Sequence, residues 1–512
     1  MSSIEKYLQK YGPTRSSVIS NYLVKIENLT PEAARKRLSR IKPPLHRFPI
    51  QLLPKKEHFI YHHDQRREEW FWINFLESMR SSGAIFGSSI DGLLARQGVV
   101  LEEEFTTISG APDVLMKGQI MAKSVIDRLI RADVIERTNF FDGNTYISIH
   151  RNELGSADWK GLKGRKLAEG ILLDGLREWV RKIGAASYNS IKIRGDADRK
   201  PIGPFMFDLA GPSYLLPVKS SGKQPGFLVA DVFAGTTLDK CQIQYFIRKV
   251  TMLHSLLKNS GVLPVLVADG FTSEALVAGH SAGVMLATPK DLFGNRVGIA
   301  MKTLLKTLNN AAAYASTSPD RIVKLIDDLS EIEGAAGNLR GVLFELLTAY
   351  LIRKDAVSID MGRLARDPKS GKTADIDILK FTNQQAECVA IECKGKVPGG
   401  SVSLEEAEEW VRRLPIFQAY LRSLSHLQEA KLSFELWTSG TFDIDARQYL
   451  EKEQGKRKKF PIKWKDGDGV IKISKEYKEK SITDALKEHF MKHPLKETNI
   501  SENVLKKNVL RP

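Results

Sequence analysis

A carboxylate and an amine follow a short apolar run in the segment CVAIECKGK, residues 388–396. Residues two apart in a β-strand face the same side of the sheet, so Glu392 and Lys394 are predicted to project together. The segment TADIDILKF also has a strand pattern, and it carries Asp375 and Asp377 on one face. The connection between the two segments is short enough for a hairpin. The sequence therefore predicts that Asp377 lies beside Glu392.

A third acid lies in the middle of an apolar helix pattern upstream. The segment NLRGVLFELLTAYLI contains Glu345 between apolar residues. A buried carboxylate costs free energy unless something compensates it. A divalent cation would compensate Glu345, Asp377 and Glu392 together, because Mg²⁺ prefers carboxylate oxygens and keeps waters and phosphate oxygens in its shell. Lys394 would then hold or activate the attacking water and offset charge that develops on a phosphate.

The order of these residues resembles the PD-(D/E)XK nuclease superfamily, which has the restriction-endonuclease-like fold. The resemblance covers about residues 334–478, from the helix with its glutamate through the hairpin, the helix pattern LEEAEEWVRRLPIFQAYLRSL and the strand patterns KLSFELWTSG and GVIKIS. It implies a mixed central sheet flanked by helices and hydrolysis of phosphodiester bonds with Mg²⁺, for which Mn²⁺ is the expected substitute. The site residues that it implies are the metal ligands Glu345, Asp377, Glu392 and the carbonyl of Cys393, with Lys394 positioning the water.

Some positions fit the resemblance less specifically. A Thr-Ala pair stands where the family has proline before its aspartate. Asp375 and Asp377 are alternative metal ligands, and Asp377 is favoured because it adjoins an apolar pair. Gln418 is similar to a glutamine that some members place near the site, although a lone helix glutamine is usually solvated. The alternative for Glu392 and Lys394 is a surface salt bridge without catalytic meaning.

A second copy of the same plan is predicted over residues 160–296. The helix pattern EGILLDGLREW and the strand patterns PFMFDLAG and LVADVFAG follow one another as in the downstream copy, which favours an internal duplication. Three acids stand at the positions of the three downstream acids, but Phe233 replaces Lys394 and has no amine to act on water or phosphate. A loose likeness between any two α/β segments is the alternative. The degenerate, non-catalytic site is predicted to consist of Asp174, Asp208, Asp231 and Phe233.

Residues 1–65 have three short helix patterns followed by two strand patterns, which predicts a winged helix-turn-helix. Thr30 and Pro31 mark the start of the third helix. A basic helix face that is merely solvated, or a module that binds protein, is the alternative to DNA contact. Residues 66–155 predict a second winged-helix-like module with a spacer or docking role. The residues predicted to contact DNA phosphates are Arg35, Lys36, Arg37 and Arg40.

The remaining segments connect or follow these domains. Residues 297–333 predict a helical bridge, residues 334–490 the active nuclease domain, and residues 491–512 a basic tail. The segment SGKT is not a phosphate-binding loop, because Arg366 stands where the first glycine is required and a strand pattern follows. No nucleotide cofactor is therefore expected.

The composition supports a partner that is a polyanion. The 512 residues carry a formal net charge of +16, which favours nucleic acid over other partners. No apolar stretch reaches the roughly 18 residues that span a bilayer, and no signal peptide is evident, so a cytoplasmic protein without a membrane partner is expected. Three cysteines are too few and too poorly spaced for a disulfide framework or a four-ligand zinc site.

The sequence therefore predicts an α/β protein with two tandem restriction-endonuclease-like domains behind winged helices. Its predicted function is that of a Mg²⁺-dependent deoxyribonuclease, and family analogy suggests restriction or defence against foreign DNA. One working centre cuts one strand per encounter, so a double-strand break requires a homodimer or two nicks, and a protein partner is left open. The alternatives are a DNA-binding regulator or scaffold with a vestigial metal site, and an RNA-directed nuclease of the same fold.

Overall fold

The computed structural model describes most of the chain, and the described residues form a mixed α/β protein. The chain divides into two compact units. The first comprises Met1–Thr138, Thr145–Asp158 and Trp179–Thr288, and the second comprises Asn139–Asn144, Trp159–Glu178 and Pro289–Pro512. The described residues are 2–139, 144–186, 190–215, 225–257, 260–309, 319–330, 336–382 and 386–491. No helix among them combines the length and apolarity needed to cross a membrane.

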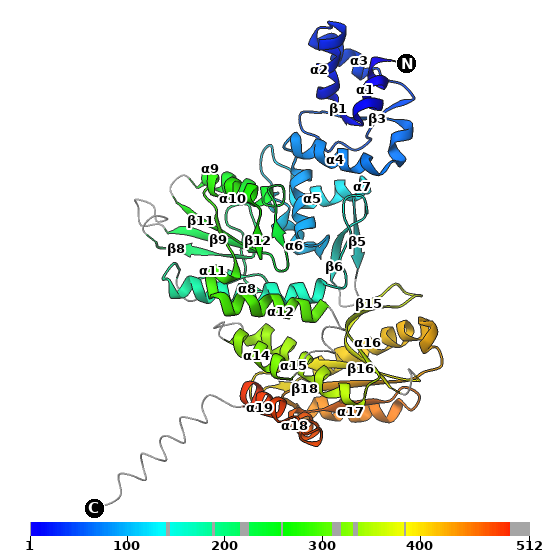
Figure 1. The fold of residues 1–512 in the computed structure, drawn as a ribbon, viewed down its shortest axis with the longest axis vertical. Helices are drawn as coiled ribbons and strands as arrows, with labels where there is room; N and C mark the ends of the chain where they lie inside the picture. Colours follow the sequence, from blue (N-terminus) through cyan, green and yellow to red (C-terminus); the bar gives the residue numbers. More distant parts are fainter. Residues whose placement is uncertain are drawn as a thin grey trace, which may run out of the picture. The chain divides into compact units, whose positions relative to one another are not determined.

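The N-terminal module of the first unit packs three helices with a three-stranded sheet of order β1-β3-β2 (Figure 1). Ser2 and Glu5 form a capping box at the start of the first helix, and Thr30 caps the third by accepting a hydrogen bond from the Ala33 N–H. The helix and ribbon order predicted for this segment is present. The elements are α1 (Ser3–Tyr11), β1 (Thr14–Arg15), α2 (Ser16–Glu27), α3 (Pro31–Ser39), β2 (Leu45–Arg47) and β3 (Phe59–His62).

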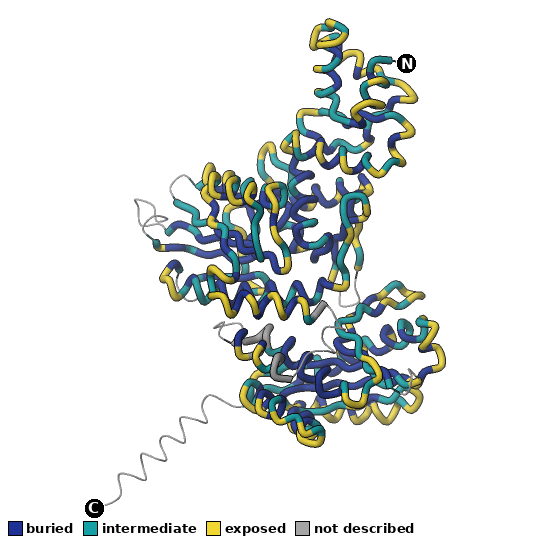
Figure 2. Tube along the Cα trace, viewed as in Figure 1, coloured by how far each residue is buried: buried dark blue, intermediate teal, exposed yellow. Residues whose placement is uncertain are grey.

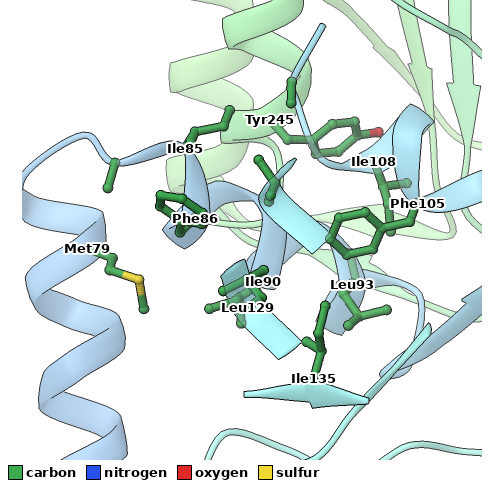
Figure 3. Close-up of a cluster of buried hydrophobic side chains, with 14 of the residues drawn as sticks. Met79, Ile85, Phe86, Ile90, Leu93, Phe105, Ile108, Leu129, Ile135 and Tyr245 are labelled. Carbon is green, nitrogen blue, oxygen red and sulfur yellow. The ribbon is translucent and has the colours of Figure 1, made fainter. Parts of the chain in front are cut away.

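A second module follows the same plan of one helix, one strand, two helices and two strands, with one additional helix, α4, before it. Its sheet has the order β4-β6-β5, which matches the order in the N-terminal module. After η1 (His63–Arg67), the elements are α4 (Glu69–Ser81), α5 (Ile85–Ala95), β4 (Val99–Leu101), α6 (Glu102–Ile108), α7 (Ala122–Arg131), β5 (Ile135–Asn139) and β6 (Thr145–Ile149). Figure 3 shows Ile90 and Leu93 of α5 in a cluster that also contains Tyr245. The second module therefore shares its core with the sheet that follows it.

The five-stranded sheet of the first unit has the order β13-β11-β9-β8-β7. Strands β7, β8 and β9 are antiparallel neighbours, whereas β9, β11 and β13 are parallel. The strands are β7 (Lys192–Ile193), β8 (Leu209–Ser213), β9 (Gly226–Val232), β11 (Val262–Val267) and β13 (Met285–Ala287), with the small pair β10 (Thr237–Leu238) and β12 (Gly270–Phe271). The helices are α9 (Gln244–Leu256) and α10 (Ser273–Ser281), and α8 (Leu162–Lys182) contains residues of both units.

The second unit contains a sheet of order β14-β15-β16-β18-β20. Its strands are β14 (Ser358–Arg366), β15 (Thr373–Thr382), β16 (Glu387–Lys394), β18 (Lys431–Thr438) and β20 (Ile462–Lys465), with the small pair β17 (Ser401–Val402) and β19 (Thr441–Phe442). Helix α15 packs against β15 and β16, and α16 packs against β14 and β15. Figure 2 shows that the central strands are buried. The helices and helical turns are α11 (Pro289–Phe293), α12 (Asn295–Asn309), α14 (Pro319–Ser330), α15 (Ala336–Ile352), η2 (Arg353–Asp355), α16 (Leu404–Ser423), η4 (Ser425–Leu427), α17 (Ile444–Lys456), α18 (Gly467–Glu476), α19 (Lys480–Leu486) and η5 (Lys487–Met491).

The two sheets share strand order, strand direction and register. In both, two antiparallel pairs are followed by two parallel pairs, and a small parallel pair lies beside the sheet. Leu209 lies opposite Ala230 in one sheet, and Ile378 lies opposite Ile391 in the other. Leu209 follows Asp208, and Ala230 precedes Asp231. In the same way, Ile378 follows Asp377, and Ile391 precedes Glu392. Such agreement is the pattern that an internal duplication leaves.

The predicted last strand of the domain at residues 334–490 is wrong. GVIKIS lies in α18, and the fifth strand is β20, which precedes it. Asp466 caps α18 by accepting a hydrogen bond from the Gly469 N–H at 2.9 Å, and Val470, Ile471 and Ser474 bury one helical face. Strand β13 of the first sheet therefore corresponds to β20.

The predicted helical bridge and basic tail are only partly described. The bridge contains α12, and α14 begins at Pro319. Residues 310–318, residues 331–335 and the tail after residue 491 lie outside the described part of the chain.

Candidate active site

Strands β15 and β16 place two acids side by side near the carboxyl end of β16. Ile378 faces Ile391 in the antiparallel register, so the next pair along the strands is Asp377 and Glu392. The Cys393 N–H donates a hydrogen bond of 2.8 Å to Asp377 Oδ2. Both carboxylates are buried. The hairpin thus fixes these two acids in the positions that the sequence predicts.

Helix α15 supplies the third predicted acid, Glu345, which is also buried. A residue that the sequence analysis missed joins it to Asp377. Lys163 Nζ, from the first turn of α8, lies 3.3 Å from Glu345 Oε2 and forms an ion pair and hydrogen bond with Asp377 Oδ1. Glu345, Asp377 and Glu392 are called the acidic cluster below.

Glu392 is held through one of its two oxygens. Its Oε1 accepts hydrogen bonds from Arg413 Nη2 at 2.7 Å and lies 3.0 Å from Lys394 Nζ. Its Oε2 is buried and has no hydrogen-bond partner among the described residues. A buried carboxylate oxygen without a partner is costly, which makes this oxygen a candidate ligand for a cation. Arg413, on α16, is the second member of the site that sequence reasoning missed.

The surroundings of the cluster shift the pKa values of Glu345 and Glu392 in opposite directions. Burial, reinforced by the nearby Asp377 carboxylate, raises the pKa of Glu345 to about 8, although Lys163 opposes the shift. Burial would also raise the pKa of Glu392, but Lys394 and Arg413 outweigh it and lower that pKa to about 2. The Glu392 carboxylate raises the pKa of Lys394, so this side chain stays an ammonium at neutral pH.

The remaining predicted site residues differ in their surroundings. Asp375 is exposed on β15 whereas Asp377 is buried in the cluster, which favours Asp377 as the ligand. Gln418 on α16 is half-buried, and its role stays a prediction. The Cys393 carbonyl likewise stays a predicted ligand, while its N–H holds Asp377.

The donor chemistry of the acidic cluster fits a divalent cation. Within the described ranges, no three His, Cys, Asp or Glu side chains are arranged as a metal-ligand set. Two of the three carboxylates nevertheless already share a cationic group, Lys163 Nζ, and the third has a buried oxygen without a described partner. Carboxylate oxygens are the ligands that Mg²⁺ prefers. Glu345, Asp377 and Glu392 are therefore the residues that would hold it.

The first unit has a different arrangement around its corresponding acids. Asp208 Oδ2 accepts hydrogen bonds from Arg96 Nη2 at 2.5 Å and from the Val232 N–H at 3.1 Å. The latter bond matches that between the Cys393 N–H and Asp377. Asp231 Oδ2 accepts hydrogen bonds from Lys249 Nζ at 2.8 Å and from the Tyr245 hydroxyl at 3.0 Å. The group of Asp208, Asp231, Arg96 and Lys249, fully buried, is called the buried ion core.

Phe233 lies beside Arg96 of the buried ion core. Its side chain is buried, and the Arg96 guanidinium lies 5.0 Å from its ring centroid. Asp174 lies on α8 in the part assigned to the second unit and accepts a hydrogen bond from Arg177 Nη2 at 3.1 Å, so its membership of the degenerate site stays a prediction. Sequence reasoning missed Arg96 and Lys249, the cations that pair with the two acids.

The predicted DNA contacts lie on the N-terminal module. All four of their side chains are exposed. Arg37 forms an ion pair with Glu27, and Arg35 lines a groove of about 620 Å³ between α2, α3 and the ribbon. Other basic residues line this groove as well: Arg47, Lys55 and Lys56. The groove therefore offers cations that the sequence analysis did not single out, and of the four predicted contacts only Arg35 lines it.

Comparisons with known proteins give no family for this chain. No family model matches it, and no curated protein matches it. Eight chains of solved structures match. One is titled "Crystal Structure of Protein of Unknown Function AF1548", with 16% sequence identity and a TM-score of 0.20, and the match covers 26% of this chain and 64% of that chain. The chain thus spans just under two thirds of that structure's length, and a likeness this weak carries no argument about function.

Proposed function

We propose that the acidic cluster and Lys394 hydrolyse phosphodiester bonds of DNA with Mg²⁺, the chemistry of the PD-(D/E)XK nucleases. The convergence of Glu345, Asp377 and Glu392 from one helix and two strands carries this proposal. The shared topology of the two sheets supports a restriction-endonuclease-like fold for both copies. The N-terminal modules, with their repeated sheet order, support winged helices.

Each residue of the site has a distinct part in this proposal. Glu345, Asp377 and Glu392 would hold the metal ion, which when bound lowers the pKa of water and polarises a phosphate. Lys394 Nζ, which lies 3.0 Å from Glu392 Oε1, acts as a hydrogen-bond donor. It would orient the attacking water and neutralise charge as the water oxygen bonds to phosphorus and the bond to the leaving oxygen breaks. Arg413 holds Glu392 in place.

DNA is the proposed substrate because the chain has a net positive charge and because basic residues line the groove of the N-terminal module. The chain carries a formal net charge of +16, which favours binding to phosphates. Arg35, Arg47, Lys55 and Lys56 gather along one groove beside α3. In winged helices the third helix and the ribbon are the elements that face duplex DNA.

A regulator with a vestigial site is the main alternative, and the two copies differ in a way that favours the enzyme. In the buried ion core, Asp208 and Asp231 have fully buried cationic partners. Both copies keep a buried carboxylate oxygen without a hydrogen-bond partner among the described residues, Asp208 Oδ1 in one and Glu392 Oε2 in the other. The copies differ in the amine: the Lys394 side chain is 28% exposed, whereas Phe233 has no amine at the corresponding position. A site with a reachable amine beside its acids is suited to ligand binding.

Incubation with supercoiled plasmid tests the proposed function. With Mg²⁺ the protein is expected to convert supercoiled plasmid to open circles before linear product accumulates, because one working centre cuts one strand per encounter. Chelation of the metal should stop the reaction. Matched linear duplex DNA and RNA are tested under the same conditions. Cleavage of RNA alone would support the RNA-directed alternative, and cleavage of no polymer would support the regulator.

A further inference from the structure

We propose that Lys163 occupies the cation position of the acidic cluster in the metal-free protein, so that a divalent metal ion must displace it. This inference rests on the proposed function, because it concerns the same carboxylates. Lys163 Nζ contacts both Glu345 and Asp377, which come from different elements, α15 and β15. One ammonium thus bridges two acids that come from separate elements.

The surroundings of Lys163 support a cation position and not a surface salt bridge. The side chains of Glu345 and Asp377 are only 11% and 8% exposed, so a negative charge on either of them needs a compensating partner. Lys163 Nζ lies 3.3 Å from Glu345 Oε2 and donates a hydrogen bond to Asp377 Oδ1. The ammonium therefore supplies this compensation in the metal-free protein.

In the buried ion core, cationic side chains also compensate the two acids, but there they are fully buried. Lys249 and Arg96 form ion pairs with the two corresponding acids, and both side chains are 0% exposed. The Lys163 side chain is 26% exposed and lies in the first turn of α8. The first turn of a helix has backbone N–H groups without intrahelical partners and opens more readily than a helix interior. Lys163 can therefore move away from Glu345 and Asp377, whereas Lys249 is enclosed by the surrounding protein.

Competition between Lys163 and the metal has a consequence for affinity. The positively charged Lys163 ammonium lies between the carboxylates and repels a divalent cation. Removal of its charge should therefore strengthen metal binding. The binding of Mn²⁺ by the full chain without nucleic acid measures this directly. Lys163→Met is expected to lower the dissociation constant for Mn²⁺ by about tenfold relative to wild type. Lys163→Arg keeps the charge and should leave the constant close to the wild-type value.

Two further variants make the result specific. Lys160 is exposed three residues earlier, so Lys160→Met removes an equal charge without contact to the cluster and should leave Mn²⁺ affinity unchanged. Asp377→Asn in the Lys163→Met background should abolish the gain. Persistence of the gain in that double variant would place the Mn²⁺ elsewhere and overturn the inference. A melting curve for each variant without metal confirms that it is folded.

The outcomes separate this inference from the proposed function. If wild type cleaves DNA but Lys163→Met binds Mn²⁺ no more tightly than wild type, Lys163 does not compete with the metal and the inference fails alone. If Lys163→Met gains affinity but neither form cleaves any polymer, the competition stands and the nuclease proposal fails. If neither form binds Mn²⁺, freeing the carboxylates does not create a metal site, which contradicts the inference.

Discussion

Replacement of Lys394 by alanine is expected to reduce the rate of plasmid cleavage by about a hundredfold or more, because the transition state loses its positioned cation. Lys394 Nζ lies 3.0 Å from Glu392 Oε1 at the edge of the acidic cluster. Arg413 still pairs with Glu392 in this variant, so the site keeps most of its compensating charge. The melting temperature and the affinity for DNA should therefore change little.

Lys396 provides a matched control for this substitution. It lies two residues after Lys394, and its Nζ donates to Glu406 at 2.6 and 2.7 Å and so points to a different partner. Lys396→Ala should cleave plasmid at close to the wild-type rate. A Lys394→Ala protein that cleaves like wild type, or equal losses in the two variants, would remove Lys394 from the chemistry.

The second large effect is expected in the buried ion core, where stability and not activity should change. Lys249→Met leaves the Asp231 charge without its ammonium in a fully buried place. Removal of one partner of a buried pair typically costs about 3–5 kcal/mol. Urea unfolding of Lys249→Met should therefore show a loss of this order in the free energy of unfolding of the first unit.

A second substitution distinguishes an unpaired charge from poor packing. Asp231→Asn removes the charge but leaves one oxygen that can accept the hydrogen bond from the Asp208 N–H, while its NH2 group can donate to the Tyr245 hydroxyl oxygen. The double variant should recover much of the stability lost in Lys249→Met. If the second substitution adds a further loss instead, the pair is not held mainly by its charges, and the account of the degenerate site is incorrect.

Local pattern was sufficient to place the acids of the candidate site. The alternation in TADIDILKF and CVAIECKGK predicts two strands, and the short connection predicts the hairpin that puts Asp377 opposite Glu392. Glu345 was recognisable because it interrupts an otherwise apolar helix. These signals lie within a few residues of the side chains that they concern.

The cations around the acids could not be predicted in the same way. Lys163 lies 214 residues from Asp377, and Arg96 lies 112 residues from Asp208. Nothing near Lys163 or Arg96 in the sequence distinguishes them from solvated basic residues. Only the packing of α8 and of α5 with their sheets brings them to the acids. A buried acid in a sequence predicts that a cation is needed, but not which residue supplies it.

The error at GVIKIS has a local cause. Apolar residues at positions 470, 471 and 473 suit an alternating strand almost as well as a helical face. The Asp466 cap favours the helix, because its carboxylate accepts a hydrogen bond from a backbone N–H that has no partner within the helix. Asp466 is a helix-capping signal that the sequence itself contains, and it outweighs the short apolar pattern.

Anomalous diffraction from a crystal grown with Mn²⁺ tests the central claim most directly. We expect one strong peak within coordination distance of Glu345, Asp377 and Glu392, with Lys163 Nζ moved away from the two carboxylates that it now joins. No comparable peak is expected at Asp208 and Asp231, because Arg96 and Lys249 occupy that place. A peak at Asp208 and Asp231, or no peak at the acidic cluster, would contradict a metal-dependent nuclease centred on Glu392 and Lys394.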